Sequence, residues 1–511
     1  MFGLCVMMLP DEFYVDYYML EGTVPKSSLI VKNWGLGLCT LAGALMGLGG
    51  GYVGLSYTAD VAPGRSAGIV KSAAVREVVD SCQGSGSAVS TITGLSLGYR
   101  STVSFVLYLA AGIYFSHALG RGLGVAFAAM GAMGTVCSLT ITTTFGPIAK
   151  NARAIVEMSG TDEESKTAAE QLCDAGNTMI AMSKGFSIVA SALCAFSLVE
   201  TLVVRGNVSR VRVSVFDPLC FVGLLVGAML PFAVSTMVLN AVFNTAEKLK
   251  QNIQQQFRDR WDSIKVQRSR PKYTECITAA TTESLRQLVP IGALILLAPL
   301  SVGLLLGTGA ITGLLLGCVL SAVPHAVSCA NSGGLWQSVH RHFQYLGPTD
   351  SYNRYKSQLV AAEHDGNLKE IKEAKRKLLE NGPKPAYEAA AICETVGDPL
   401  KDMVASSMSI LMKELAMISL VMVPFFSSVR GGYGTIGCDI DRDCNAEKYP
   451  MEGFDLLLLG IFGALGLGLT VRQCVAKCRG TTSAPSEFGD ASDPQLMPLI
   501  NNSQTKQERV V

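Results

Sequence analysis

The chain contains few charged residues and few histidines. Only 16% of its 511 residues are Asp, Glu, Lys or Arg, whereas a soluble domain carries about 25%. It has five histidines and no paired CxxC motifs, so the spacing of a zinc site is missing. The net charge of +1 excludes the overall basic field typical of a nucleic-acid-binding protein. These absences argue against a soluble domain and against nucleic acid as a partner.

The chain is instead rich in long apolar segments. Hydrophobic residues make up 49% of the chain, and its 52 glycines suit close helix packing in lipid. Since a membrane span needs about 20 apolar residues, the sequence predicts an all-α, polytopic transmembrane helix bundle. The candidate spans are 35–56, 97–119, 122–145, 178–204, 217–241, 288–306, 309–330, 404–427 and 454–471.

Two basic segments set the expected orientation. Segments 245–272 and 337–388 are rich in Lys and Arg, and positive loops favour the cytoplasmic side. Two spans separate them, which is consistent with both lying on that side. The links 120–121 and 205–216 then fall on the opposite side, although three arginines in the second link argue mildly against this.

The two ends of the chain suggest additions to the main bundle. The apolar segment Met1–Leu9 would reach only about 14 Å as a helix, so we interpret it as the stump of a preceding span within region 1–34. Region 35–427 holds the main set of spans. Region 428–471 is predicted to be a link and an extra transmembrane helix, with a re-entrant or interfacial helix as the alternative because the apolar run is short. The polar region 472–511 is predicted to be a disordered cytoplasmic tail.

One segment concentrates residues that suit chemistry. Glu394, Asp398 and Asp402 are spaced i, i+4, i+8, so a helix places them on one stripe. Lys401 flanks the stripe, and Lys413 lies three turns further along it. Three stacked carboxylates repel one another in lipid, and oxygen ligands beside lysines suit Mg²⁺ bound to a phosphate substrate. A solvated helix end with a capping role is the alternative.

The same segment carries a family resemblance. GDPLKD at 397–402, followed by an apolar helix with a lysine, resembles the last core helix of the membrane-bound, vacuolar-type, proton-translocating inorganic pyrophosphatases. Other blocks are similar to that family in the same order: VKNW (31–34), DSCQGSGSAVSTITGLSLGY (80–99), FGPIAKNARAIVEM (145–158), DAGNTMIAMSKGF (174–186), VGLLVGAMLPF (222–232) and ANSGGLWQ (330–337). The resemblance covers the C-terminal half of the family fold, spans nine to sixteen.

The resemblance implies roles for individual residues. Those that match the family's site are Asp402 as the catalytic, water-activating carboxylate, Glu394, Asp398 and Asp402 as metal ligands, Lys401, Asn177 and Lys184 as substrate ligands, and Lys413 on the ion path. Glu394 replaces a family aspartate. The partner carboxylate expected from the first half of the family fold has no counterpart here.

Three family aspartates are replaced in this chain. Thr143, Lys150 and Gln337 stand at their positions, which should weaken Mg²⁺ binding because hard cations need charged oxygen ligands. Arg153 replaces a glycine, and together with Lys150 it adds charge that attracts a bare anion. His340 and Arg341 stand where the family has two lysines.

The resemblance implies a pyrophosphate-energised proton pump, in which hydrolysis of Mg-pyrophosphate drives proton translocation across a membrane. We expect this chain to be a truncated and catalytically impaired member, with Mg²⁺ as cofactor, pyrophosphate and the lipid bilayer as partners, a homodimeric state, and a vacuolar or acidocalcisomal location. The alternative is a non-catalytic membrane subunit or paralogue, and a generic secondary transporter is a third. Ile180 matches neither potassium subclass, so potassium dependence stays open.

Overall fold

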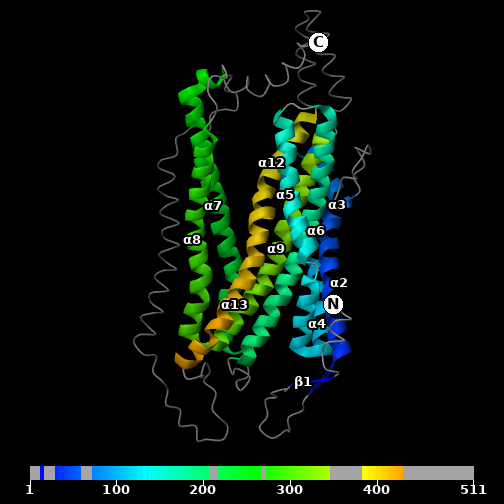
Figure 1. Ribbon diagram of the computed structural model, residues 1–511, viewed down its shortest axis with the longest axis vertical. Helices are drawn as coiled ribbons and strands as arrows, with labels where there is room; N and C mark the ends of the chain where they lie inside the picture. The colour runs from blue at the N-terminus through cyan, green and yellow to red at the C-terminus, as the bar shows by residue number, and fades with distance from the viewer. Residues whose placement is uncertain are drawn as a thin grey trace, which may run out of the picture. The chain divides into compact units, whose positions relative to one another are not determined.

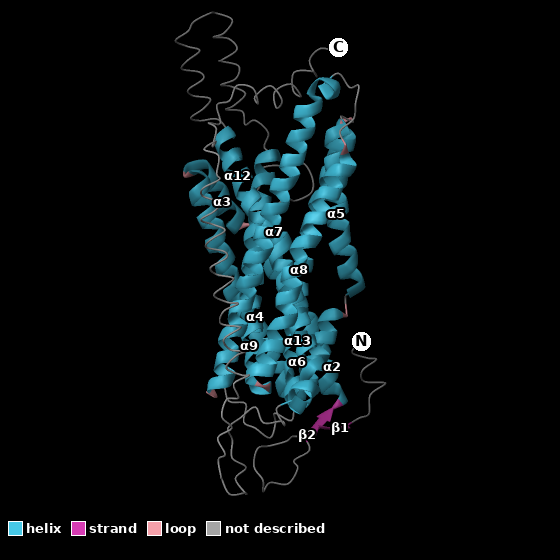
Figure 2. Cartoon of the chain, turned by 90° about the vertical axis from the view of Figure 1, so that its left-hand side faces the viewer, coloured by secondary structure: helices cyan, strands magenta, loops and turns pink. Residues whose placement is uncertain are grey.

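The computed structural model describes residues 12–15, 29–58, 72–134, 136–159, 162–205, 216–265, 272–345 and 383–429. Nearly all of these residues lie in long helices that run side by side (Figure 1; Figure 2). The predicted all-α, polytopic bundle is therefore confirmed. The predicted N-terminal stump, the extra span 454–471 and the tail 472–511 lie outside the described residues.

The described elements begin with a short two-stranded β-sheet, and helices follow it. Strand β1 (Glu12–Val15) pairs antiparallel with β2 (Leu29–Lys32), which leads directly into the first described helix. The helices are α2 (Asn33–Thr58), α3 (Ala73–Gly84), α4 (Gly86–Met133), α5 (Val136–Ser159), α6 (Glu163–Arg205), α7 (Pro218–Lys265), α8 (Tyr273–Leu306), α9 (Thr308–Tyr345), α12 (Pro383–Asp398), the π-helix η2 (Pro399–Val404) and α13 (Ala405–Val429).

Seven helical segments within the described residues are long and apolar enough to cross a membrane. They are α2, α4, α6, α7, α8, α9 and the continuous run from α12 through α13. The chain is therefore an integral membrane protein. The predicted span 97–119 and the first part of the predicted span 122–145 fall on α4, which breaks between them at Arg121 (φ 52°), so the predicted link at 120–121 is a kink.

The predicted span 122–145 is not one helix. α4 ends at Met133, and α5 begins at Val136. Gly131 and Gly134 lie at this interruption, and glycine weakens a helix because it loses the most conformational freedom on folding. A hydropathy pattern does not register such a break, since the residues on both sides of it are apolar.

Glycines let α7 and α9 cross closely. Gly223 and Gly227 on α7 face the backbone carbonyls of Ala310 and Leu314, and Gly313 and Gly317 on α9 face those of Cys220 and Leu224, with no room for a side chain at any of the four positions. Both helices thus carry the small-xxx-small pattern that brings transmembrane backbones together.

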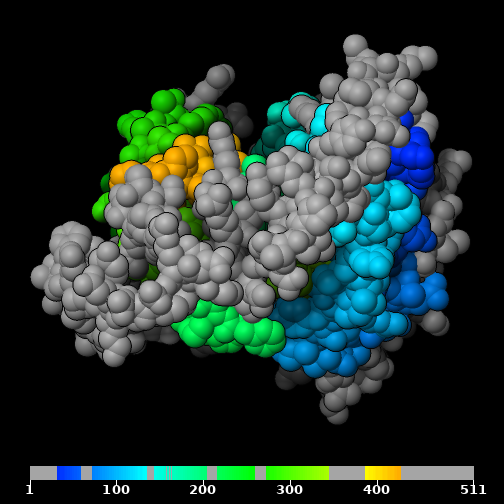
Figure 3. Space-filling model, turned by 90° about the horizontal axis from the view of Figure 1, so that it is seen from below, coloured from blue at the N-terminus to red at the C-terminus, as the bar shows by residue number. Residues whose placement is uncertain are grey.

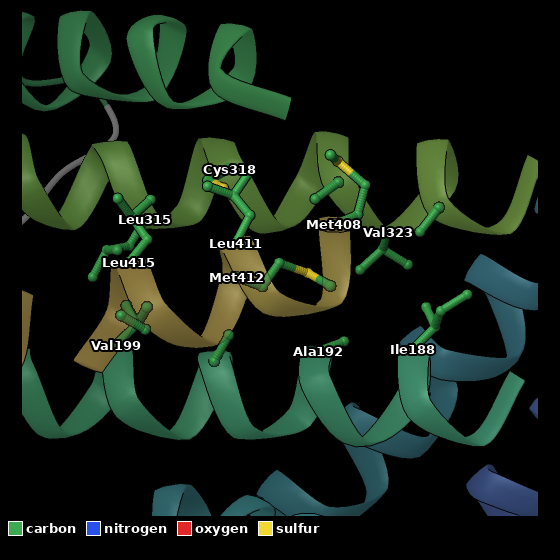
Figure 4. Packing of buried hydrophobic residues seen from close by; sticks show 14 of the residues in the cluster. Ile188, Ala192, Val199, Leu315, Cys318, Val323, Met408, Leu411, Met412 and Leu415 are labelled. Atoms are coloured by element: carbon green, nitrogen blue, oxygen red, sulfur yellow. The ribbon is translucent and has the colours of Figure 1, made fainter. Parts of the chain in front are cut away.

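The central apolar core lies between α6, α9 and α13. Figure 4 shows Leu411 and Leu415 of α13 facing Leu315 and Cys318 of α9, while Val199 of α6 lies on the other side of α13. In lipid, close van der Waals packing of this kind stabilises helix association. The core holds together α6 and α9, which carry several polar residues of the next section, and α13, which continues from η2.

One end of the bundle carries the helix ends that flank the first predicted basic segment. The end of α7 and the start of α8 lie at the same end as α3 and α12, whereas β1 and the end of α13 lie at the other (Figure 1). Figure 3 views this other end, where α13 (orange) lies beside the green atoms of the α7–α8 hairpin. The predicted orientation assigns the basic end to the cytoplasm and stays a prediction.

Candidate functional site

A π-helix interrupts the run from α12 to α13. η2 spans Pro399–Val404, and Pro399 at its start has no backbone N–H to continue the α-helical pattern. Such single π turns occur often at functional sites. Here the π turn buries Lys401, which is 4% exposed, and leaves the side chain of Asp402 46% exposed. It also changes the regular spacing on which the predicted carboxylate stripe depends.

Lys401 is the centre of a polar cluster. Its Nζ donates hydrogen bonds to Asp398 Oδ1 and to Gln337 Oε1, each at 2.8 Å. It also lies 3.6 Å from Asp402 Oδ2. One buried ammonium therefore holds two of the three predicted metal ligands, together with the glutamine that replaces a family aspartate.

Lys184 joins α6 to this cluster. Its Nζ donates to Asp402 Oδ1 at 2.7 Å and to the backbone carbonyl of Lys401 at 2.8 Å. Asp402 thus lies between two lysines, one on each of its oxygens. Asn177 lies two helical turns before Lys184 on α6, and its amide donates to the carbonyl of Cys173 at 2.7 Å.

Two neighbouring residues of α9 pair with two other carboxylates. His340 Nδ1 is hydrogen-bonded to Glu394 of α12. Arg341 pairs with Asp174 of α6 at 3.2 Å, with side chains 9% and 8% exposed. The second ring nitrogen of His340, Nε2, is buried and has no hydrogen-bond partner among the described residues. The role of Asp174 was missed at the sequence level, although it lies in the quoted DAGN block.

A small polar cavity lies beside these pairs. Its lining includes Asp174, Asn177, Lys184, Gln337, Arg341 and Lys401. The cavity measures about 40 Å³, and since one water needs about 10–15 Å³ on this measure, it holds only a few water molecules. It therefore brings the predicted substrate ligands together, but it is too small to enclose a pyrophosphate.

Helix α5 adds a further cation. Lys150 interacts electrostatically with Lys401, Asp398 and Asp402. Burial lowers the pKa of the Lys150 amine, as does the neighbouring Lys401 ammonium, while the two carboxylates oppose the shift. Thr143, one of the other replaced family positions, is exposed on the same helix. The replacement at position 150 thus puts positive charge where the resemblance implies a carboxylate.

The three predicted metal ligands do not meet one another. Glu394 pairs with His340, Asp398 with Lys401, and Asp402 with Lys184. Within the described residues no group of three or more His, Cys, Asp or Glu side chains is placed to hold a metal ion. As arranged, these residues do not fit a Mg²⁺ site of their own, and their predicted role as metal ligands stays a prediction.

The predicted ion-path residue lies further along the bundle. Lys413 on α13 interacts electrostatically with Cys194 on α6, ten residues beyond Lys184 and so about 15 Å along the helix. Since α6 is continuous between these positions, it links the polar cluster to Lys413. The role of Lys413 in ion movement is not tested by this arrangement.

Comparison with known proteins adds a family assignment to this geometry. A family model described as "Inorganic H+ pyrophosphatase" matches residues 6–422. The chain is 30% identical to the "K(+)-insensitive pyrophosphate-energized proton pump" of Caldanaerobacter subterraneus subsp. tengcongensis, over 67% of this chain and 46% of that protein.

Two further relatives show the same pattern. The "K(+)-stimulated pyrophosphate-energized sodium pump" of Thermotoga maritima is 30% identical over 68% of this chain and 45% of its own length. The "Pyrophosphate-energized membrane proton pump 3" of Arabidopsis thaliana is 30% identical over 67% of this chain and 42% of its own length. The chain thus spans about half the length of the curated relatives that it matches.

Proposed function

Because this chain belongs to the inorganic H+ pyrophosphatase family, we propose that it works in a membrane as part of a pyrophosphate-energised ion pump. The observation that carries this proposal is the cluster formed by Lys184, Lys401 and Asp402. Residues that the family resemblance marks as substrate ligands come from α6 and η2, far apart in the sequence, and lie within hydrogen-bonding distance of one another.

The share of this chain in the reaction is to bind and orient a phosphoryl group. Lys150, Lys184, Lys401 and Arg341 lie among the carboxylates of Asp174, Glu394, Asp398 and Asp402, so the cluster offers several cationic donors. Charge-assisted hydrogen bonds from ammonium groups to phosphate oxygens are about twice as strong as neutral ones. A phosphoryl oxygen would take the place of Asp402 or Gln337 as an acceptor from these lysines.

Asp402 is the proposed water-positioning carboxylate. Its side chain is 46% exposed, and Lys184 and Lys401 hold its two oxygens. Both lysines thereby fix the orientation of the carboxylate, which is what in-line attack by a water requires. No step is assigned to Mg²⁺, because the described carboxylates already pair with side chains of this chain.

Hydrolysis by this chain alone is proposed to be impaired. Thr143, Lys150 and Gln337 replace three carboxylates implied by the resemblance, and Lys150 places a positive charge beside Lys401. The alternative of a non-catalytic membrane subunit is not favoured by the relatives, whose names all describe pyrophosphate-energised pumps.

Several finer features belong to the same proposal. We assign region 35–427 to a pyrophosphatase-like domain, region 428–471 to a link with one more transmembrane helix, and region 472–511 to a cytoplasmic tail. We further propose a homodimer in a vacuolar or acidocalcisomal membrane, with Lys413 on the ion path. The family resemblance supports each of these features.

Binding of pyrophosphate to the purified chain tests the proposed site. Calorimetry in detergent, with a chelator present to remove metal ions, measures the affinity of the chain for metal-free pyrophosphate. Lys184→Met and Lys401→Met should each weaken binding about 10- to 100-fold, since a hydrogen bond to a charged group contributes roughly 1.5–3 kcal/mol. The matched control is Lys250→Met, whose side chain is 61% exposed on α7. Equal binding by all four proteins would refute the assignment.

A further inference from the structure

Two cysteines that are far apart in the sequence meet between α3 and α12. Cys82 lies on the last turn of α3 and Cys393 on α12, and both side chains belong to one buried cluster, close enough to interact with each other. Both are free thiols, 3% and 0% exposed. The two helices are in contact, so their backbones are already brought together around this pair.

Polar groups of α4 surround the pair. The Cys393 thiol donates to the carbonyl of Ser87 at 3.8 Å, and its sulfur lies 3.4 Å from the Thr91 hydroxyl. The Ser90 hydroxyl, which donates to the carbonyl of Gly86 at 2.8 Å, lies beside Cys82. Among the described residues neither thiol is hydrogen-bonded to a charged side chain, and no third metal ligand joins them.

The groups around Cys82 and Cys393 argue against a catalytic or a zinc-binding role for the two thiols. A catalytic cysteine is activated by a base or a cation beside it, and a structural zinc site needs four ligands. Neither is present around Cys82 and Cys393 in the described part of the chain. Two adjacent thiols retain one reaction that needs no further group, which is their joint oxidation.

We propose that Cys82 and Cys393 are an oxidative modification site, at which a small two-electron oxidant of the disulfide or peroxide class joins α3 to α12. With oxidised glutathione, one thiolate attacks the glutathione disulfide and releases one reduced glutathione, and the second thiol then displaces the other. The protein gives up two protons and two electrons. The S–S bond between Cys82 and Cys393 forms, and the S–S bond of oxidised glutathione is broken.

Access to the pair comes from the turn after α3. Gln83, Gly84, Ser85 and Gly86, which directly follow Cys82, are all exposed. The thiols therefore lie one residue below a solvent-facing turn, within reach of a small oxidant during local opening. α3 lies at the basic end of the bundle (Figure 1), which the predicted topology assigns to the reducing cytoplasm, so the pair stays reduced until oxidant rises.

The disulfide would constrain the helix that leads into the polar cluster. Cys393 is followed directly by Glu394, which pairs with His340, and α12 runs on into η2. Because a cross-link between distant parts of a chain restricts the unfolded state, oxidation should also raise thermal stability. The proposed function of the cluster is not required for either effect.

Mass spectrometry of the full chain in detergent tests this site. After treatment with oxidised glutathione, a non-reducing digest should contain a peptide pair linked through Cys82 and Cys393, which dithiothreitol separates. Cys82→Ser should remove the linked pair, and the matched control Cys318→Ser, a change at a buried free cysteine of α9, should keep it. Oxidation of other cysteines without this link in the wild-type chain would overturn the proposal.

Thermal unfolding provides the second measurement. Oxidation should raise the melting temperature of the wild-type chain by a few degrees and leave that of Cys393→Ser unchanged. If a serine variant does not fold, the wild-type comparison of oxidised and reduced protein still decides the question. A melting temperature that is equal in both states, in a sample with the link formed in full, would contradict the proposed constraint on α12.

Discussion

The buried pair of Arg341 and Asp174 makes the sharpest test of the site's energetics. The two side chains are 9% and 8% exposed and lie 3.2 Å apart. Asp174→Ala removes the carboxylate, so the buried guanidinium of Arg341 loses this partner. Breaking a buried ion pair in this way costs about 3–5 kcal/mol, so Asp174→Ala and Arg341→Met should each be strongly destabilising.

A double variant separates the pair from the rest of the fold. Asp174→Ala combined with Arg341→Met removes both charges, so neither member of the pair stays in the interior without the other. The cost of the double variant should therefore fall below the sum of the two single costs by about 1–3 kcal/mol. It should be no less stable than the worse single variant, because apolar replacement of a whole buried pair is often nearly neutral.

Thermal unfolding in detergent measures these differences. A thiol-reactive fluorophore reports unfolding, since Cys173, Cys318 and other buried cysteines become accessible. The single variants should melt several degrees lower than the wild-type chain. Lys250→Met is the control, because its exposed pair with Glu247 should contribute under about 1 kcal/mol. Single variants that shift no more than this control, or costs that simply add, would refute the reasoning.

Three further predictions concern packing, activity and orientation. Gly227→Val should destabilise the α7–α9 crossing by about 1–3 kcal/mol or more in thermal unfolding, whereas Gly292→Ala, with open space around the new methyl group, should be nearly neutral. The chain expressed alone should show no Mg-dependent pyrophosphatase activity above background, and activity that Asp402→Ala abolishes would disprove this. A cysteine placed at Val208 in sealed vesicles should be labelled only from the non-cytoplasmic side, and labelling from the cytoplasm would invert the topology.

The sequence was sufficient to predict the helices but not their interruptions. Apolar length alone predicted the helices that became α2, α6, α7, α8, α9 and α13. The kink at Arg121 fell on a predicted link, but the break between α4 and α5 did not. Helix ends inside an apolar stretch depend on glycine positions and tertiary contacts, and a hydropathy pattern averages over both.

The sequence named candidate site residues but not their pairings. Lys184, Lys401 and Asp402 meet, while their roles as substrate ligands and catalytic carboxylate stay predictions. The carboxylate stripe assumed an α-helix throughout, whereas η2 is a π-helix. Pro399 was the available signal for that change. Glu394, which lies before η2 on α12, pairs with His340, a partner that spacing along one helix cannot identify because it lies on another.

The replaced positions take on a different meaning once their partners are known. In the sequence, Gln337, His340 and Arg341 count only as departures from the family pattern. In the structure, each one contacts a residue of the site, namely Lys401, Glu394 and Asp174. A site without a function would be free to lose its buried charges, because replacing whole ion pairs by apolar residues is often neutral or stabilising. Lys401 and Arg341 are nevertheless buried with acceptors in place, an arrangement that suits the anion binding proposed above.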